Sequence, residues 1–144
     1  MQLAHCHAFV SGRILVFCGS CGDSTRFHFE SLAHDNDAEH SEITAIVPPN
    51  ANDQDASSST TPAPVICSGW QRVAKYNRSA SDKVEIKLAV YRLPVQKIDL
   101  ILSVNLPHVL ADGTVTPPSV VDAVTAAFES AANSLSIVDF GLFA

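Results

Sequence analysis

Two segments near the middle of the chain alternate between apolar and polar residues, and this period of two is typical of β-strands. In the first segment, Val84–Leu93, four aliphatic residues share one face: Val84, Ile86, Leu88 and Val90. In the second segment, Ile98–Leu106, five residues recur in the same way: Ile98, Leu100, Leu102, Val104 and Leu106. The other faces are mostly polar, so we expect half-buried strands with one side in solvent. The link Pro94–Lys97 is short and predicts antiparallel pairing.

The N-terminal part of the chain predicts a strand, a helix and a second strand. Arg13–Cys18 holds four consecutive apolar residues and predicts a short buried strand. A helix with Thr25–His34 as its body is expected next, and Asp23 or Ser24 is suited to cap it. After an acidic and polar stretch, Glu42–Val47 predicts another strand.

The C-terminal part predicts one more strand before the alternating pair, and then a helix and a last strand. Val65–Tyr76 is the first of these, and Ser136–Phe143 closes the chain. The helix is expected to begin near Pro118, a residue suited to the first helical position. Ser119 with Asp122 resembles a capping box. Apolar residues recur along this helix at steps of three or four: Val120, Val124, Phe128, Ala131 and Leu135.

The predicted order is strand, helix, strand, a meander of three strands, helix and strand. We therefore predict an α+β fold in which helices pack on a mainly antiparallel sheet. The length of 144 residues indicates a single domain, 1–144. Pro48–Pro64 is rich in Ser, Thr, Asn, Asp and Pro, and it predicts a mobile loop.

Charge and composition argue against several classes of function. The net charge is −6, and an acidic chain repels phosphate backbones, so we expect a basic protein surface as partner and no nucleic acid. The apolar run Ile14–Cys18 is far shorter than the roughly 20 residues of a membrane helix. Met1–Ser11 lacks the basic start of a signal peptide, so we expect the cysteines to lie in a reducing compartment. We also expect a monomer. There, Cys67 most simply fills core volume.

Four blocks of sequence, in order, resemble one known family. Arg26–Ala33 (RFHFESLA) is similar to a "RYHFEDLA" helix, and Gly69–Lys75 (GWQRVAK) is similar to a "G-x-Q-x-V-x-K" strand. Lys97–Pro107 (KIDLILSVNLP) is similar to a "TDLLIT-N-P" strand, and Leu135–Phe143 (LSIVDFGLF) is similar to a closing "L-x-I-x-D-x-x-L-F" strand. By these blocks the chain resembles the Ran guanine nucleotide release factors over residues 25–143.

This resemblance implies a fold like that of the photosystem protein PsbP, with an antiparallel sheet between helices. It implies a protein that binds the small GTPase Ran, promotes nucleotide release, supports nuclear protein import and is found in nucleus and cytoplasm. It implies no cofactor, metal or catalytic residue, so we expect a binding protein and not an enzyme. Asp99 and Asn105 match the family pattern, and we expect them to serve turn geometry at strand ends.

The resemblance does not reach the beginning of the family pattern. The family opens with a "LFGGA" strand and a carboxylate-rich segment that holds its main Ran-contacting carboxylates. Neither has a counterpart in Met1–Phe9 or Arg13–Ser20. We therefore expect an N-terminally divergent or truncated domain with weak or absent Ran binding, and an inactive truncated product is an alternative.

The remaining acidic residues are the candidates for partner binding: Glu30, Asp35, Asp37, Glu39 and also Glu42. Such carboxylates steer association with a basic surface. A solvated helix end and loop would explain the same cluster without any partner. Trp70 and Tyr76 are either anchors for a partner or members of the core.

Cys18 and Cys21 form a CGSC motif that indicates a different class of function, thiol–disulfide redox chemistry. The motif lies between an apolar strand and a helix, where a helix N-terminus lowers the pKa of a thiol. Against this hypothesis, the residues after Cys21 delay the predicted helix. His5-Cys6-His7 together with the motif offers zinc ligands, but zinc sites are usually built from two well-spaced pairs.

Overall fold

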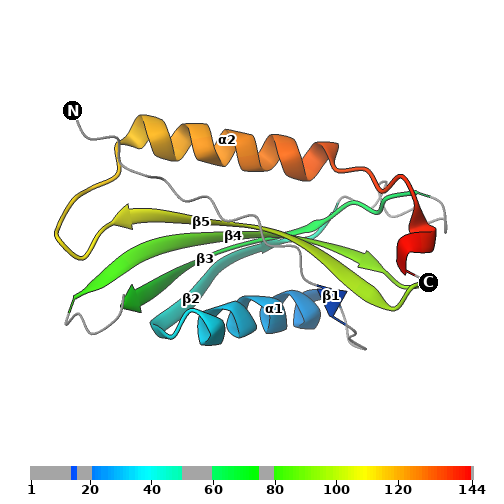
Figure 1. The fold of residues 1–144 in the computed structure, drawn as a ribbon, viewed down its shortest axis with the longest axis horizontal. Coiled ribbons are helices and arrows are strands. Elements are labelled where there is room, and N and C mark those ends of the chain that lie inside the picture. Colours follow the sequence, from blue (N-terminus) through cyan, green and yellow to red (C-terminus); the bar gives the residue numbers. More distant parts are fainter. Residues whose placement is uncertain (1–13, 16–20, 50–59, 75–79, 144) are drawn as a thin grey trace.

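The computed structural model describes residues 14–15, 21–49, 60–74 and 80–143, and in it a sheet lies between two helices (Figure 1). The elements follow one another as β1 (Ile14–Leu15), α1 (Cys21–Asp35), β2 (Ala38–Val47), β3 (Val65–Ala74), β4 (Ser81–Leu93), β5 (Ile98–Val109), α2 (Pro118–Ser134) and the 3₁₀ helix η2 (Phe140–Phe143). The predicted α+β class, with an antiparallel sheet packed between helices, is confirmed.

The five strands of this sheet are arranged in the order β1-β5-β4-β3-β2, and every neighbouring pair is antiparallel. The predicted meander is β3–β4–β5, and its last turn is the predicted Pro94–Lys97. Lys97 closes this turn with a φ of 57°, and its N–H donates to the carbonyl oxygen of Pro94 at 3.3 Å. Of the predicted first strand, Arg13–Cys18, the structure describes Ile14–Leu15, which pairs with β5 at Leu100 and Asp99.

Helix α1 covers one face of the sheet. Phe29 is buried against the aliphatic row of β4, which is the row predicted from the period of two. Gly69 on β3 makes room for this contact, because a Cβ at that position would overlap the Phe29 ring and the carbonyl oxygen of Glu42. The aliphatic face of β4 and one residue of β5 complete the buried cluster: Val84, Ile86, Leu88, Val90 and Ile101.

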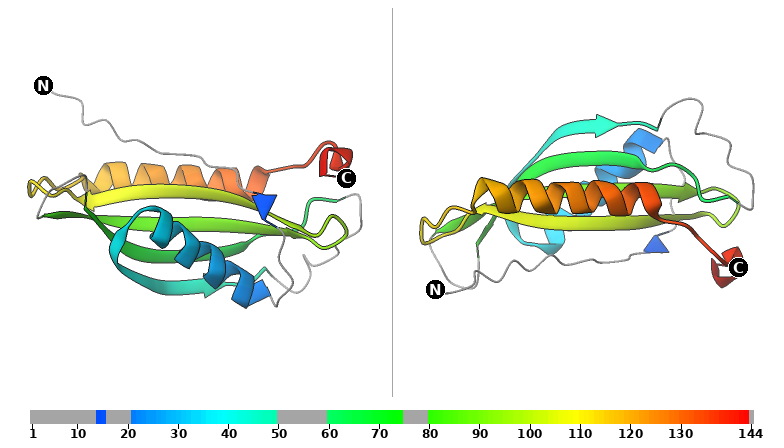
Figure 2. Two further views of the ribbon diagram at one scale, coloured as in Figure 1. Left: turned by 60° about the horizontal axis from the view of Figure 1, so that its bottom comes forward. Right: turned by 90° about the horizontal axis from the view of Figure 1, so that it is seen from above.

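Helix α2 covers part of the other face, above β5 and β4 (Figure 2). Ala89 and Tyr91 are fully buried on that face, so the prediction that it meets solvent is wrong at these two positions. The hydroxyl of Tyr91 donates to the carbonyl oxygen of Ala132 on α2 at 2.6 Å. Burial raises the pKa of Tyr91 to about 12, because the ionised phenol would lose its solvation.

Two boundaries near the N-terminus differ from the prediction. Helix α1 begins at Cys21, so Asp23 and Ser24 lie inside its first turn and do not precede it as caps. Strand β2 begins at Ala38, four residues before the predicted start at Glu42. Strand β2 begins earlier because its polar residues already pair with β3, starting with Ala38 opposite Val73. The described parts of the predicted loop, 48–49 and 60–64, contain no helix or strand.

The end of the chain differs more. The predicted strand Ser136–Phe143 is wrong, since this segment ends in the 3₁₀ helix η2. Three apolar residues at steps of three pack against the α2-side cluster: Ile137, Phe140 and Phe143. The backbone N–H of Ile137 donates to the Thr61 hydroxyl oxygen at 2.6 Å and not to a neighbouring strand.

Helix α2 begins at Pro118 as predicted, but Ser119 and Asp122 do not form the predicted capping box. Pro117 is the N-cap residue, and no side chain caps the helix. The predicted apolar stripe is confirmed at Val124, Phe128 and Leu135, which face the α2-side cluster. It is wrong in the last turn, where Ala132 is buried and Ala131 is exposed. Neither helix in the described part of the chain is long and apolar enough to cross a membrane.

Candidate functional site

The predicted partner-binding carboxylates lie at the corner where α1 passes into β2, which we call the acidic corner. Glu30 and Asp35 are on α1, Asp37 is in the connecting turn and Glu39 is near the start of β2. All four are exposed. Asp37 has a φ of 49°, a left-handed conformation that Asp tolerates better than most residues because its short polar side chain can bond locally.

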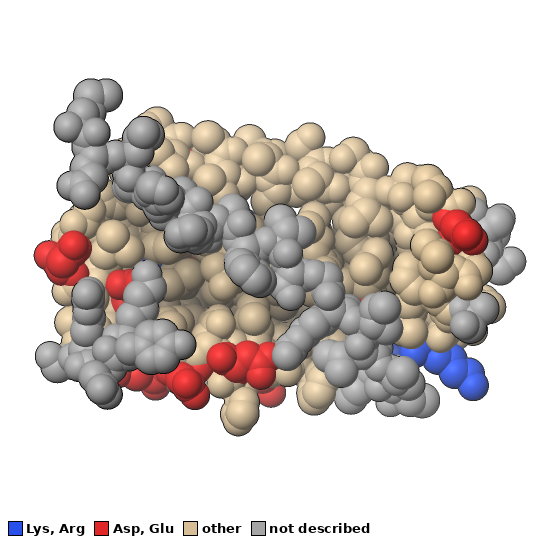
Figure 3. Space-filling view, viewed as in Figure 1, with Lys and Arg blue, Asp and Glu red and all other residues tan. Residues whose placement is uncertain are grey.

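Figure 3 shows carboxylates along the lower edge of the molecule, where α1 lies. Among the described residues in this view, Lys and Arg side chains appear only at the far end of that edge. Carboxylates therefore predominate along the described part of this edge, and Nδ1 of His34 lies 4.0 Å from Asp35 within it. A surface of one sign attracts a partner surface of the opposite sign and raises the rate of encounter.

A buried polar cluster that sequence reasoning missed joins α1 to β5. Asp99 receives a hydrogen bond from the Ser24 hydroxyl, and its Oδ2 lies 2.9 Å from Nε2 of His28. Nε of Arg92 on β4 lies 3.9 Å from the other oxygen of Asp99. The predicted turn role of Asp99 is wrong, since its side chain is only 3% exposed. Asn105 likewise lies within β5, opposite Ile86, and not at a strand end.

The electrostatics of this cluster are those of a structural anchor. Burial alone would raise the pKa of Asp99, but the hydrogen bonds from His28 and Ser24 and the charges of His28 and Arg92 outweigh it and lower the pKa. Ser24, His28 and Asp99 are all buried, so the cluster presents no nucleophile to solvent. His28 and Asp99 occur in two separate family-like blocks, and this is the sequence signal that could have indicated the cluster.

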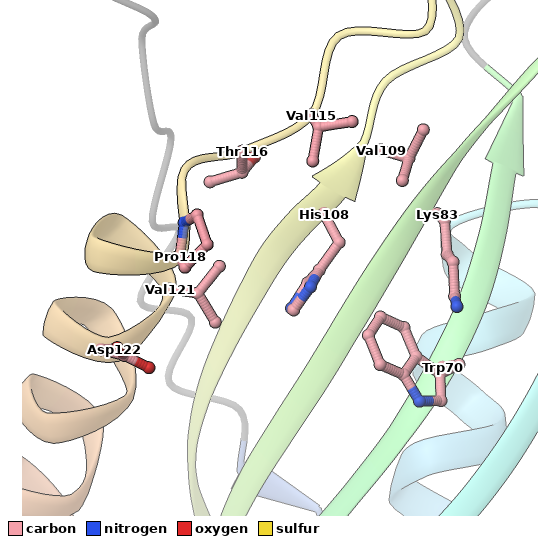
Figure 4. A pocket seen from close by; sticks show the side chains of 9 residues that line it. All are labelled: Trp70, Lys83, His108, Val109, Val115, Thr116, Pro118, Val121 and Asp122. Atoms are coloured by element: carbon pink, nitrogen blue, oxygen red, sulfur yellow. The ribbon is translucent and has the colours of Figure 1, made fainter.

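A pocket of about 360 Å³ lies on the opposite face, beside the first turn of α2 (Figure 4). Its floor is formed by Trp70, Lys83 and His108, from the three central strands. Apolar side chains of the β5–α2 loop and of α2 face this floor, among them Val115 and Val121. Trp70 is half-buried here, so its predicted role as an anchor for a partner stays open, while Tyr76 lies outside the described residues.

The polar residues of the pocket are held in a fixed arrangement. Nζ of Lys83 lies 4.3 Å from the centroid of the Trp70 ring, and the His108 ring meets the same indole edge-on at 4.7 Å. Glu85 contacts Nε2 of His108 at 2.9 Å and Nζ of Lys87 at 2.8 Å. Burial alone would raise the pKa of Glu85, but these two partners outweigh it and lower the pKa.

The redox and zinc hypotheses stay untested predictions. Cys18 and the residues His5-Cys6-His7 lie outside the described part of the chain. One argument against the redox motif is wrong, however, because α1 already begins at Cys21. Cys67 fills the core as predicted, and burial raises the pKa of its thiol to about 11. Within the described ranges, no three His, Cys, Asp or Glu residues converge on a common metal position.

Comparison with known proteins identifies relatives of this sequence. A family model described as Ran-interacting Mog1 protein matches residues 18–107, from before α1 to the last part of β5. A curated protein of Danio rerio, Ran guanine nucleotide release factor, is 26% identical over 125 residues. That alignment covers 84% of this chain and 68% of the relative. No solved structure matches the chain.

Proposed function

This chain belongs to the Ran-interacting Mog1 protein family, and from this premise we propose that it binds the GTPase Ran and promotes release of the bound guanine nucleotide. The family match over residues 18–107 carries the proposal, and the name of the Danio rerio relative supports the release activity. We further propose that the protein acts in nuclear protein import and is present in nucleus and cytoplasm.

The proposed activity needs no catalytic residue in this chain. A release factor that binds the nucleotide-poor state of a GTPase more tightly weakens nucleotide binding by the same factor, because the two binding free energies are reciprocally linked. All covalent chemistry of the nucleotide then remains with Ran, and the chain contributes only binding free energy. We therefore classify the proposed activity as binding and release and not as enzymatic catalysis.

We propose the acidic corner as the surface that meets Ran. Its four carboxylates are exposed, three of them lie at the tight turn between α1 and β2, and carboxylates predominate along this edge in Figure 3. Such a surface favours a basic partner and acts mainly on the rate of association. The buried Ser24–Asp99–His28 cluster supports this corner indirectly, because it fixes α1 on the sheet.

The proposal is tested with purified Ran loaded with a fluorescent guanine nucleotide. We expect the chain to accelerate loss of fluorescence. A variant that neutralises Glu30, Asp35, Asp37 and Glu39 as Gln or Asn should bind Ran about tenfold more weakly, mainly through a slower association rate. The difference in Ran affinity between the parent and this variant should become smaller at high salt, which screens exposed charges.

A control neutralises two other exposed carboxylates, Glu129 on α2 and Asp139 near η2, and should leave the affinity unchanged. Equal weakening per charge removed in the two variants would show that only net charge matters and would refute the acidic corner. No binding of Ran to the parent chain in calorimetry would refute the function itself. Because the N-terminal part departs from the family pattern, we expect slower release than with the Danio rerio relative, and equal rates would contradict this expectation.

A further inference from the structure

We propose that the pocket at Trp70 is a second docking site, which takes an acidic segment of a protein partner with an apolar side chain beside a carboxylate. This site lies on the face of the sheet opposite α1 and the acidic corner. The inference therefore does not depend on the proposed binding of Ran.

The lining of the pocket combines two kinds of surface (Figure 4). On the α2 side, Val115 and Val121 present apolar surface, and Val115 is 64% exposed. On the sheet side, the indole of Trp70 lies beneath the ammonium group of Lys83. An occupant that satisfies both must bring an apolar group and an anion close together.

The cations at this site are available to such an anion. Glu85 already forms an ion pair with Lys87 and a hydrogen bond with His108, so it does not compete for Lys83. Lys83 forms no ion pair with any carboxylate of the described residues, and it is held by the Trp70 ring. Arg72 on β3 lies opposite Lys83 on β4 in the strand register. Its exposed side chain is on the same face of the sheet, because residues opposite each other point the same way. In a chain of net charge −6, this places two cations side by side.

The surroundings of the pocket favour an extended protein segment over a small enclosed ligand. Helix α2 lies above β5 and β4, and the same face of β3 and β2 continues beside it without a covering helix (Figure 2). Val47 on β2 is 56% exposed. The pocket thus adjoins a part of the sheet face that no described helix covers, and an extended segment can continue from the pocket across β3 and β2.

The orientation of the occupant follows from Asp122. Figure 4 shows this carboxylate on α2, across the pocket from Lys83 and Trp70. The anion of the partner is therefore directed to the Lys83 side, and its apolar side chain is directed to the valines. Removing the charge of Asp122 should then strengthen binding, whereas removing that of Lys83 should weaken it.

The experiment uses Trp70 as the reporter, because it is the only tryptophan of the chain. The full chain is titrated with a hexapeptide of alternating Glu and Leu, and the binding midpoint is read from the emission of Trp70. Two control peptides alternate Gln with Leu or Glu with Ser. We expect saturable binding of the Glu/Leu peptide and at least threefold weaker binding of both controls, since each lacks half of the recognised chemistry.

Two variants decide the roles of the charges. Lys83→Met should weaken binding about threefold to fivefold, the size expected for one partly exposed charge pair, and Asp122→Asn should strengthen it by a similar factor. Lys97→Met makes the same chemical change at an exposed position in the distant β4–β5 turn and should have no effect. Calorimetry repeats each midpoint, because loss of the cation above the ring changes the emission itself.

Four results would overturn the proposal. The first three are no saturable response in the parent chain, equal binding by the Glu/Leu and Gln/Leu peptides, and unchanged midpoints in both Lys83→Met and Asp122→Asn. A fourth is binding of hexanoate as tight as that of the peptide, because it would assign the pocket to a small anion. If Lys83→Met fails to fold by circular dichroism, the strengthening expected for Asp122→Asn still decides the outcome.

Discussion

Asp99 is a carboxylate in the interior of the molecule, and its neighbours determine what it does. An isolated buried charge is costly, and it persists only when hydrogen bonds and opposite charges compensate the lost solvation. Ser24, His28 and Arg92 provide this compensation from one helix and one neighbouring strand. The alternating pattern of β5 placed Asp99 on the face opposite Leu100, but it predicted solvent there. At the scale of residues, burial and not sequence pattern assigns this side chain its role.

Asp99→Asn should destabilise the fold by about 3 kcal/mol at pH 7, because the neutral amide loses the charge that strengthens the bonds from Ser24 and His28 and turns an N–H donor toward Arg92. The pKa of Asp99 is lowered in the folded state, below the roughly 3.9 of an unfolded Asp. Its contribution is therefore present above about pH 4 and is lost as pH falls through the folded pKa. Urea unfolding at several pH values should show that the difference in free energy of unfolding between parent and variant becomes smaller in acid.

Glu129→Gln is the control for this measurement, since Glu129 is exposed on α2 and its loss should change the free energy of unfolding by less than about 0.5 kcal/mol. A gap between parent and Asp99→Asn that stays constant down to strongly acidic pH would contradict the ionised state assigned to Asp99.

At the scale of elements, α2 shows how packing refines a periodic pattern. The steps of three and four predicted a stripe through Ala131, but the helix turns Ala132 toward the sheet. Tyr91 accounts for this register, because its hydroxyl reaches the carbonyl oxygen of Ala132 while its ring fills the space below the helix. The sheet face beneath α2 is thus defined by one aromatic residue that the pattern alone placed in solvent.

Ala132→Leu should therefore lower the free energy of unfolding by about 1–3 kcal/mol, because added carbon atoms have no space above Tyr91. Ala131→Leu makes the same change one residue earlier on the exposed side, and it should alter stability by less than about 0.5 kcal/mol. Thermal or urea unfolding of the two variants checks this order. A larger loss for Ala131→Leu would restore the predicted stripe and refute the observed register of α2.

At the scale of the whole molecule, the two proposed sites lie on opposite faces of the sheet. Helix α1 and the start of β2 carry the exposed carboxylates of the acidic corner. The α2 side carries the pocket with Lys83, and Arg72 is exposed beside it. The two surfaces share no residue, but they lie near each other at one end of the sheet, because Arg72 is opposite His40, the residue that follows Glu39.

If the two proposed sites act independently, a saturating amount of the Glu/Leu peptide should change the affinity for Ran by no more than about twofold, because the two sites share no residue and lie on opposite faces of the sheet. Fluorescence anisotropy of labelled Ran, with and without peptide, measures this directly. The Glu/Ser peptide provides the control for nonspecific effects of added carboxylates. Strong competition by the Glu/Leu peptide would instead mean that Ran itself occupies the pocket at Trp70.

The sequence by itself determined the α+β class, the β3–β4–β5 meander, the start of α2 at Pro118 and the family of the chain. Each of these follows from the local periodicity of apolar residues, from turn residues or from contiguous motif blocks, so it can be predicted without any contact between distant segments. The exposure of Glu30, Asp35, Asp37 and Glu39 also follows from their local sequence.

Only the tertiary structure decided the partners of Asp99, the burial of Ala89 and Tyr91, the early start of β2, the 3₁₀ end of the chain and the pocket at Trp70. Each depends on residues far apart in sequence, such as Ser24 with Asp99 or Tyr91 with Ala132. A contact of this kind leaves no local period, because its free energy arises only when the two segments have been brought together by the rest of the fold.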